Sequence, residues 1–412
     1  MSWKHRGSLA LVTLAGTHLV IDAYSSSYAP LLAALRARLD LTLAQVGGCA
    51  AALAFSASLL QPLYGFLSDR LRSRFQIALA PAITALGLAA LSWSDSYLSA
   101  LLLFAAAGIG IAAFHPQGAA QAREATSRRP GLMMSLFFGG GNIGYALGPL
   151  LAGLALAWWG WPGLWRIAIP GMAATLVLLW LAPEPQRRRH RSTGAVPALR
   201  RHSKPLLLLY MLVVVRGSVQ VIFVGFLPLY FIDLGYGLGG SSRSLSAFLA
   251  AGAFGGLCGG LLNDRLGSRA VIRLSMAGSL PFLAGAFLLP AAWQPVALST
   301  GYFILLMSLP VNLLMAQDWV PEYRGTVSSL MMGFAWGMGG VMAPLVGRLA
   351  DLYGLSRALL LVAMLPLAGI CLAWRLPEGP SEKAASLQAR SRLLPETASA
   401  APELHRDRPP PG

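Results

Sequence analysis

Four ionisable residues lie inside long apolar stretches of the sequence: His18, Asp22, His115 and Arg216. His18 and Asp22 are four residues apart, so a helix places them on one face. An Asp at membrane depth costs about 2.5–3.5 kcal/mol on insertion scales and normally faces a cavity or a partner. Because burial disfavours the charged carboxylate and imidazole titrates near neutral pH, the pair could accept and release a proton. A purely structural pair within a helical bundle is the alternative.

His115 and Arg216 extend this chemistry to other parts of the chain. Pro116 follows His115 and bends the helix, so His115 could face a cavity as a proton carrier or substrate ligand, or serve only structure. Arg216 could pair with Asp22 across a central cavity. Alternatively, it could bind an anionic substrate, because guanidinium holds carboxylate or phosphonate bidentately. Further candidate contacts to substrate are Tyr24, Gln117, Asn142, Tyr230 and Trp336, although an Asn can equally hold two helices together.

The amino-acid composition indicates the class of protein in which these residues lie. Of the 412 residues 56% are hydrophobic and 12% charged, whereas soluble proteins carry about 25% charged residues. Apolar runs of about 20 residues recur along the chain, which predicts an all-α polytopic membrane protein. The net charge of +16 is therefore interpreted as a topology signal and not as a nucleic-acid site. We expect no enzyme activity, cofactor or metal, and we expect the three cysteines to be buried and inert.

Twelve transmembrane helices are predicted, the first of them a retained N-terminal helix and not a cleaved signal peptide. Lys and Arg gather in the N-terminus, 69–74, 121–131, 183–204, 264–273, 317–325 and the tail, so the positive-inside rule puts both termini in the cytoplasm. The predicted spans are 8–32, 43–67, 76–94, 97–120, 132–157, 163–182, 205–231, 244–262, 271–291, 295–316, 326–349 and 358–376.

A repeat divides the chain into two halves. Residues 65–74 return as 260–269, and the same offset aligns Arg129 with Arg324, Gly144 with Gly339 and Pro149 with Pro344. Parallel repeats of this kind build transporters whose substrate site lies between the halves. We predict two pseudo-symmetric six-helix bundles, 1–182 and 205–376. A basic cytoplasmic linker, 183–204, joins them, and a disordered cytoplasmic tail, 377–412, follows.

The doubled segment resembles the loop signature Gly-x-Leu-x-Asp-Arg-x-Gly-x-Arg of the major facilitator superfamily. The second copy matches throughout, and the first departs at Arg72. In that family these loops stabilise one gate of the transport cycle, and an Asp at a helix end can accept hydrogen bonds from a neighbouring helix N-terminus. The resemblance implies gating roles for Asp69, Arg70, Arg74, Asp264, Arg265 and Arg269. Gly148-Pro149 resembles the family's antiporter signature and is assigned to gating as well.

Several stretches are similar to the fosmidomycin resistance branch of that superfamily. They cover about residues 8 to 360 and include His18 to Tyr24, 114–116, 140–144, Arg216 with 226–230, 317–325 and 336–340. The resemblance implies a proton-driven antiporter in the bacterial inner membrane, acting as a monomer in the lipid bilayer and exporting a small, phosphonate-like molecule. Proton coupling would fall to Asp22, His18 and His115. A metabolite importer or exchanger, for a sugar or organic acid, and a non-transporting sensor on the same fold remain alternatives.

Overall fold

The computed structural model describes residues 7–71, 74–124, 130–182, 195–323, 327–328 and 330–379. Within these ranges the chain is helical, without a strand. Several parts of the sequence analysis lie outside these ranges: Arg129 and Arg324 of the repeat, Arg72 of the loop signature, most of the predicted linker and the tail from residue 380.

The N-terminal half contains six long helices in sequence order. The bounds are α1 Gly7–Leu39, α2 Leu43–Leu71, α3 Phe75–Ala89 with the short η2 Ala90–Trp93, α4 Tyr97–Glu124, α5 Pro130–Trp159, η3 Leu164–Ile167 and α6 Ala168–Leu181.

The C-terminal half repeats this order with more interruptions. The bounds are α7 Ala195–Arg201, α8 Ser203–Asp233, α9 Gly237–Leu266, α10 Ser268–Gly285, η4 Ala286–Leu288, η5 Ala291–Trp293, α11 Gln294–Leu306, α12 Ser308–Trp319, η6 Pro321–Tyr323, the π-helical η7 Leu330–Phe334, α14 Ala335–Val341, α15 Ala343–Tyr353, α16 Leu355–Ala363 and α17 Pro366–Trp374. The end of the predicted linker is thus helical.

Ten helical segments of the described residues are long and apolar enough to cross a membrane. The first and eleventh predicted spans are the two that fall short. α1 has the length, but its middle carries His18, Asp22 and several hydroxyl residues. The eleventh span is divided among η7, α14 and α15. Both pack inside the bundle, α1 on α5 and α14 on α8, so the architecture agrees with twelve helices.

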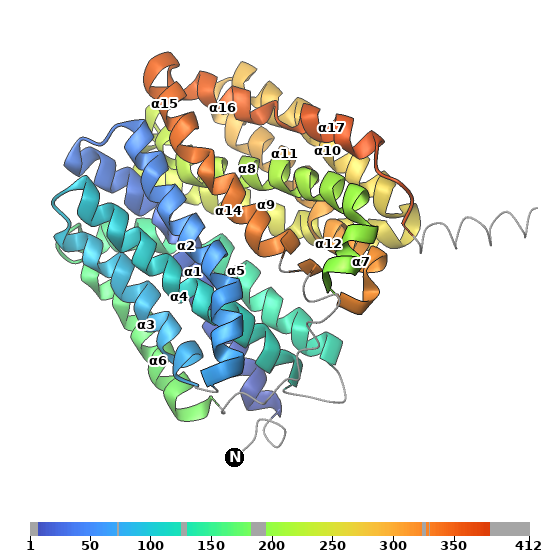
Figure 1. Cartoon of the computed structure of the whole chain (residues 1–412). Helices are drawn as coiled ribbons and strands as arrows, with labels where there is room; N and C mark the ends of the chain where they lie inside the picture. The colour runs from blue at the N-terminus through green and yellow to red at the C-terminus, as the bar shows by residue number, and fades with distance from the viewer. Residues whose placement is uncertain are drawn as a thin grey trace, which may run out of the picture.

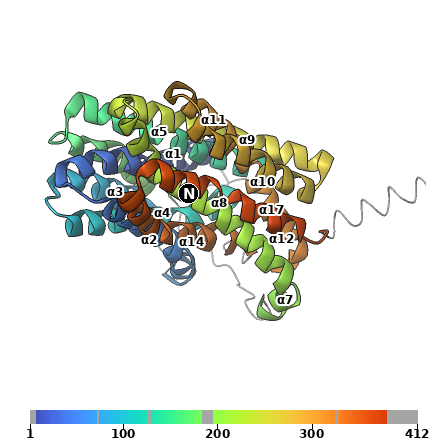
Figure 2. The same ribbon diagram turned by 90° about the horizontal axis from the view of Figure 1, so that it is seen from above.

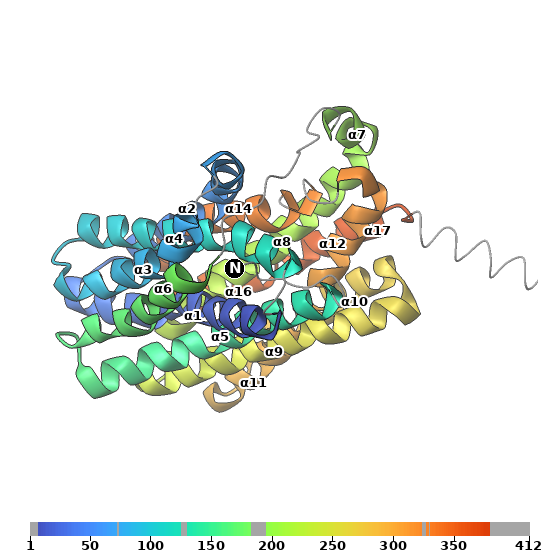
Figure 3. The same ribbon diagram turned by 90° about the horizontal axis from the view of Figure 1, so that it is seen from below.

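The two halves lie side by side and touch along two seams (Figure 1). α5 packs on α9 along one seam, and α2 packs on α14 and α15 along the other. Seen from below, α5, α9 and α11 form one edge of the molecule, whereas α7 projects away from the bundle (Figure 3). In the view from above, α8 lies near the middle, between α14 and α9 (Figure 2). α1 and α8, the first helices of the two halves, are therefore central.

In the second copy of the doubled loop, the glycine adopts a backbone conformation that other residues avoid. Gly267 joins α9 to α10 with φ 79° and ψ 162°, a backbone region that is essentially reserved for glycine. It ends one helix and begins the next within a single residue. We call the end of the bundle where this loop lies the basic end. The other end, reached at residues 40–42 and 234–236, is called the opposite end.

Candidate functional site

Asp22 of α1 lies between two imidazoles. His18 Nε2 is 3.1 Å from one carboxylate oxygen, and His115 Nε2, from α4, forms a hydrogen bond of 3.1 Å with the other. The His18 side chain is 3% exposed, whereas Asp22 and His115 keep 17% and 26% of theirs exposed. The structure therefore brings together the three residues that the sequence analysis assigned to proton coupling. We call them the His–Asp–His group.

A hydrogen bond from Nδ1 orients each of the two histidine rings. His18 Nδ1 lies 2.8 Å from the Phe137 carbonyl oxygen of α5, and His115 Nδ1 lies 2.8 Å from the Ile111 carbonyl oxygen of its own helix. A carbonyl only accepts hydrogen bonds, so each Nδ1 donates. His18 also stacks on the Phe137 ring, with centroids 4.1 Å apart. These contacts point both Nε2 atoms at the carboxylate.

A glycine stripe on α5 lets this helix approach α1 closely. A side chain at any of its three glycines would collide with the α1 backbone, as is usual where small residues bring membrane helices together. The colliding pairs follow one another at one-turn intervals: Gly140 with Ala15, Gly144 with Leu19, and Gly148 with Ala23. The stripe is thus a helix contact, in which Gly148 packs on Ala23 and Ser26 of α1.

Gly141 makes room for the group itself. A Cβ at this position would lie 2.6 Å from Asp22 Oδ2 and equally close to His18 Nε2. α5 therefore covers the His18–Asp22 contact with backbone alone, and the neighbouring stripe holds it at that distance.

Arg216 of α8 stands apart from the His–Asp–His group. It is buried, with 4% exposure, and its Nη1 donates to Gln220 Oε1 at 3.3 Å, while its Nε has no hydrogen-bond partner. Among the described residues no carboxylate lies within ion-pair distance of it, so this structure does not contain the Asp22–Arg216 pair that was one of two alternatives for Arg216. Asp22 satisfies its charge with two histidines inside its own half.

Tyr145 of α5 is a further buried residue, which the sequence analysis did not select. Its hydroxyl is buried and forms no hydrogen bond of acceptable geometry, although the Gln220 amide lies nearby. Gln220 accepts from Arg216 Nη1 and also lies near Tyr145. Arg216 Nε and the Tyr145 hydroxyl are two buried donors without a hydrogen-bond partner.

Three other candidate substrate-binding residues form hydrogen bonds within their own half of the protein. The Tyr24 hydroxyl donates to the Ile167 carbonyl and accepts from the Gly171 amide at 3.0 Å. Gln117 Nε2 donates to Gln76 Oε1 at 2.5 Å, and the Tyr230 hydroxyl donates to Gln294 Oε1 at 2.6 Å. Each of these residues holds helices of one half together.

The remaining predicted residues are less informative. Asn142 is exposed, and nothing is described of the Trp336, Asp69 and Arg70 side chains. Arg74 precedes α3 and is half-buried, whereas Asp264 and Arg265 are exposed at the end of α9. Arg269 pairs with Glu378 at 2.5 Å.

The halves are joined most firmly at the opposite end. Asp351 of α15 accepts hydrogen bonds from the Leu43 and Ala44 amides, at 2.8 and 2.9 Å, and so caps the N-terminus of α2 across the seam. Thr42 and Gln45 form a capping box at the same helix end, which satisfies the next amide.

Close backbone packing and a second hydrogen bond accompany this cap. Gly47 lies against the Ala343 backbone, and Gly347 against that of Leu43. On the other seam the Leu150 amide donates to Ser246 Oγ at 3.0 Å. The hydrogen bonds between the halves that join described residues lie toward this end.

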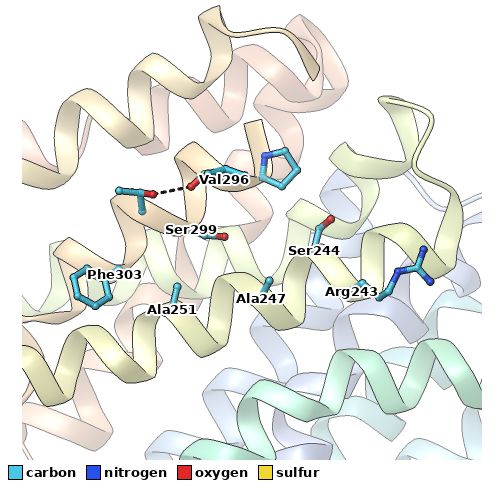
Figure 4. A pocket seen from close by; sticks show the side chains of 9 residues that line it. Arg243, Ser244, Ala247, Ala251, Val296, Ser299 and Phe303 are labelled. Atoms are coloured by element: carbon cyan, nitrogen blue, oxygen red, sulfur yellow. Dashed lines mark hydrogen bonds between the residues drawn. The ribbon is translucent and has the colours of Figure 1, made fainter. Parts of the chain in front are cut away.

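The described residues contain one group with metal-ligand chemistry and one surface groove. The ligand atoms of the His–Asp–His group lie within 4.8 Å of one another, and two imidazoles with a carboxylate are a donor set that Zn²⁺ accepts. Each Nε2, however, already faces a carboxylate oxygen at a hydrogen-bond distance. A groove of about 580 Å³ lies between α9 and α11, lined by Arg243, Ala247, Ala251 and Phe303 among others (Figure 4). It contains none of the residues above.

Comparison with known proteins assigns this architecture. The model of the Major Facilitator Superfamily matches residues 14–344. The chain belongs to the major facilitator superfamily. It is 30% identical over 375 residues to the fosmidomycin resistance protein of Escherichia coli strain K12, covering 88% of this chain and 91% of the relative. Its identity to the uncharacterised transporter YfnC of Bacillus subtilis strain 168, of the same superfamily, is 29% over 381 residues, covering 89% and 92%.

A solved structure shows the same fold. The crystal structure of a bacterial homologue of the human lysosomal transporter Spinster, in an inward-facing and occupied conformation, superposes with a TM-score of 0.77 at 15% identity, covering 89% of this chain and 96% of that chain. The recognition of the superfamily and the predicted fold class are confirmed, and the protein is a membrane transporter and not an enzyme.

Gly141→Ala tests whether the bare α5 backbone positions the His–Asp–His group. The new methyl group would push Asp22 and His18 apart, and we expect a loss of about 1–3 kcal/mol of stability from overpacking, seen as a lower Tm in detergent. Gly139→Ala is the matched control, because nothing lies within 4 Å of its Cβ position. Equal melting of the two variants would contradict this role of Gly141.

Asp351→Ala tests the cap between the halves. Loss of a charged cap costs about 1 kcal/mol or slightly more, so we expect the population open at this end to rise by up to about tenfold. Spin labels at Ala37 and Leu352, with the native cysteines replaced, would report it as a longer distance component. Asp95→Ala, at the same end, should leave the distribution unchanged, and an unchanged distribution in Asp351→Ala would refute the cap.

Proposed function

We propose that this protein is a secondary active exporter in which protons moving into the cell drive the efflux of a small anionic solute by alternating access. One observation carries the proposal: Asp22 is held between two histidines at membrane depth, while the buried Arg216 has no acidic partner. The first site suits protons and the second suits an anion.

The proton site is supported by its partners. A carboxylate and two imidazoles in direct contact can exchange protons among themselves, and histidine titrates in the physiological range. The exposed part of Asp22 and His115 gives this group a route to water that a sealed structural pair would lack. Protonation changes the charge at the point where Gly141 of α5 covers the His–Asp–His group, so it acts on the contact between α1 and α5.

The anion site is supported by its unsatisfied donors. Leaving a buried guanidinium donor unpaired costs more than the average hydrogen bond gains, so Arg216 calls for a ligand that completes it. A phosphonate or carboxylate oxygen accepting from Arg216 Nε and from the Tyr145 hydroxyl would satisfy both groups. The name of the E. coli relative, fosmidomycin resistance protein, supports a phosphonate-like substrate.

The distribution of Lys and Arg supports the orientation in the membrane. With the basic end placed in the cytoplasm by the positive-inside rule, the opposite end, where hydrogen bonds join the halves, faces outward. The proposed direction of export rests on the name of the E. coli relative and not on this conformation, because importers and exporters both pass through such a state. We place the protein as a monomer in the bacterial inner membrane with both termini cytoplasmic, and we keep the predicted division into bundles 1–182 and 205–376, linker 183–204 and tail 377–412.

Asp22→Asn tests the coupling. The amide keeps the size of the side chain but cannot carry an exchangeable proton, so we expect efflux of fosmidomycin driven by a pH gradient to fall at least about tenfold in proteoliposomes. Exchange of labelled for unlabelled fosmidomycin without a gradient should survive and serves as the control for folding and binding. Full gradient-driven efflux in this variant would remove Asp22 from the mechanism.

Arg216→Gln tests the anion site. A hydrogen bond to a charged group contributes about 1.5–3 kcal/mol, so we expect the Kd for fosmidomycin to rise about 10- to 100-fold, measured by ligand-dependent thermal shift. Arg243→Gln, in the groove of Figure 4, is the matched control and should leave Kd unchanged. An unchanged Kd in Arg216→Gln, in protein with a normal Tm, would rule out this site.

A further inference from the structure

The His–Asp–His group has the donor atoms and the ring orientation of a metal site. We propose that it binds Zn²⁺ through His18 Nε2, His115 Nε2 and the Asp22 carboxylate, with water as the fourth ligand. The sequence analysis expected no metal; the fold brings His115 to the pair from 93 residues away. Binding does not depend on the proposed transport function, whereas its effect on transport does.

Hydrogen bonds from Nδ1 make both Nε2 atoms available as ligands. His18 Nδ1 lies 2.8 Å from the Phe137 carbonyl oxygen, and His115 Nδ1 lies 2.8 Å from that of Ile111. A neutral imidazole whose hydrogen is held on Nδ1 has a lone pair on Nε2. Histidines that bind metals almost always donate their other nitrogen to a carbonyl, a carboxylate or water in this way. Both rings are thus fixed in the tautomer and orientation that a metal ion requires.

The spacing of the ligand atoms suits a small ion. The three atoms lie within 4.8 Å of one another, in the one group of His, Cys, Asp and Glu side chains with such spacing among the described residues. Each Nε2 is 3.1 Å from an oxygen of Asp22. Ligands bound to tetrahedral Zn²⁺ lie about 3.3 Å apart. The nitrogen–oxygen distances therefore already match this geometry, and a movement of the imidazole side chains toward each other completes it.

A bound ion would replace the present contacts between the imidazoles and the carboxylate. Zn–N bonds form at the two Nε2 lone pairs and a Zn–O bond forms at Asp22, while any hydrogen held between nitrogen and oxygen passes to water. The carboxylate offsets one of the two charges of the ion. Asp22 and His115 keep 17% and 26% of their side chains exposed, so water can reach the ion as the fourth ligand.

The donor types and the surrounding side chains favour Zn²⁺ over Mg²⁺ and Ca²⁺. Imidazole nitrogens suit zinc and its neighbours among the transition metals, whereas magnesium and calcium take oxygen ligands. Phe114, Phe137 and Phe138 lie around His18, with ring centroids 4.1–6.2 Å away. Such an apolar shell limits the access of solvent to a metal site. One side of the group is therefore dry, and the other side is open to water.

Titration of purified protein with Zn²⁺ tests the site without transport. The protein is treated with a chelator, carries no polyhistidine tag and has glutamine in place of the histidines outside the group. They are His5, His190, His202 and His405. We expect calorimetry to show one bound Zn²⁺ and the Tm to rise, because an ion that binds the folded state stabilises it. Mg²⁺ at the same concentration is the control and should do neither. Absence of Zn²⁺ binding would overturn the proposal.

Variants in the same background locate the bound ion. His115→Gln and Asp22→Asn each remove one ligand and keep a side chain that can form hydrogen bonds. Changes outside the ligands alone weaken metal binding by about 10- to 100-fold, so we expect the Kd for Zn²⁺ to rise at least about tenfold in each variant. Asp95→Asn, at the opposite end, is the matched control and should leave Kd unchanged. An unchanged Kd in either ligand variant would place the ion elsewhere and overturn the proposal.

X-ray absorption at the zinc edge reports the ligands in protein that keeps its native Asp22, His18 and His115. We expect nitrogen and oxygen ligands at about 2.0–2.2 Å and the outer scattering of two imidazoles. A sulfur ligand at about 2.3 Å would come from a cysteine. Either that sulfur or a single imidazole would overturn the proposal, even if the variants did not fold.

Transport tests the consequence of binding. Bound Zn²⁺ joins α1 to α4 and occupies the carboxylate that the proposed function assigns to the proton. We therefore expect Zn²⁺ to inhibit fosmidomycin efflux driven by a pH gradient, half-maximally at the Kd from calorimetry. Full efflux at saturating Zn²⁺ would refute this inhibition. Absence of gradient-driven efflux without Zn²⁺ would refute the proposed function instead, while the binding of Zn²⁺ would stand.

Discussion

The carboxylate of Asp22 needs hydrogen-bonding partners at membrane depth, and this need determines how three helices of the N-terminal half pack. Asp22 needs partners because an unpaired charge in an apolar interior is costly, and it takes them from two places: one turn back on α1 and across to α4. His18 in turn reaches the backbone of α5. Three helices are thereby fixed around one side chain. This arrangement requires the glycines of α5, since any side chain at position 141 would collide with Asp22 and His18.

Comparison of the two repeats separates the helix contacts that both halves share from the ionisable residues that occur in only one half. Gly144 of α5 meets α1, and its counterpart Gly339 of α14 meets α8 at Gly217, so the same close helix contact exists in both halves. The ionisable residues do not repeat: the counterpart of Asp22 is Gly217, and that of Arg216 is Ile21. Each half therefore contributes a common helix packing and an ionisable residue that the other half lacks.

Sequence reasoning reached the fold because its signals are local or periodic. Apolar runs, the doubled loop and the glycine stripe each predict an element or a contact between neighbouring elements. The i, i+4 spacing of His18 and Asp22 likewise predicted one shared face. It could not show that His115, on α4, completes the group, nor that Asp351 caps α2, because both contacts join segments far apart in the sequence. Asp351 lies in the last turn of α15 at the opposite end, where an acidic residue carries no signal of its own.

Polar residues inside apolar helices proved an ambiguous signal for a binding site, for a physical reason. In a bilayer every buried polar group needs a partner within the protein, so most such residues are there to be satisfied. Tyr24 uses its hydroxyl both as donor and as acceptor within its own half, and the Tyr230 hydroxyl donates to Gln294. Arg216 and Tyr145 retain buried donors without acceptors, but so do Gln76 and Asn312, and Gln117 retains an unpaired oxygen beside the bond that joins α4 to α3. Unsatisfied hydrogen-bonding capacity, which only the folded arrangement reveals, therefore selects candidates for a ligand contact but does not separate them from residues that hold helices together.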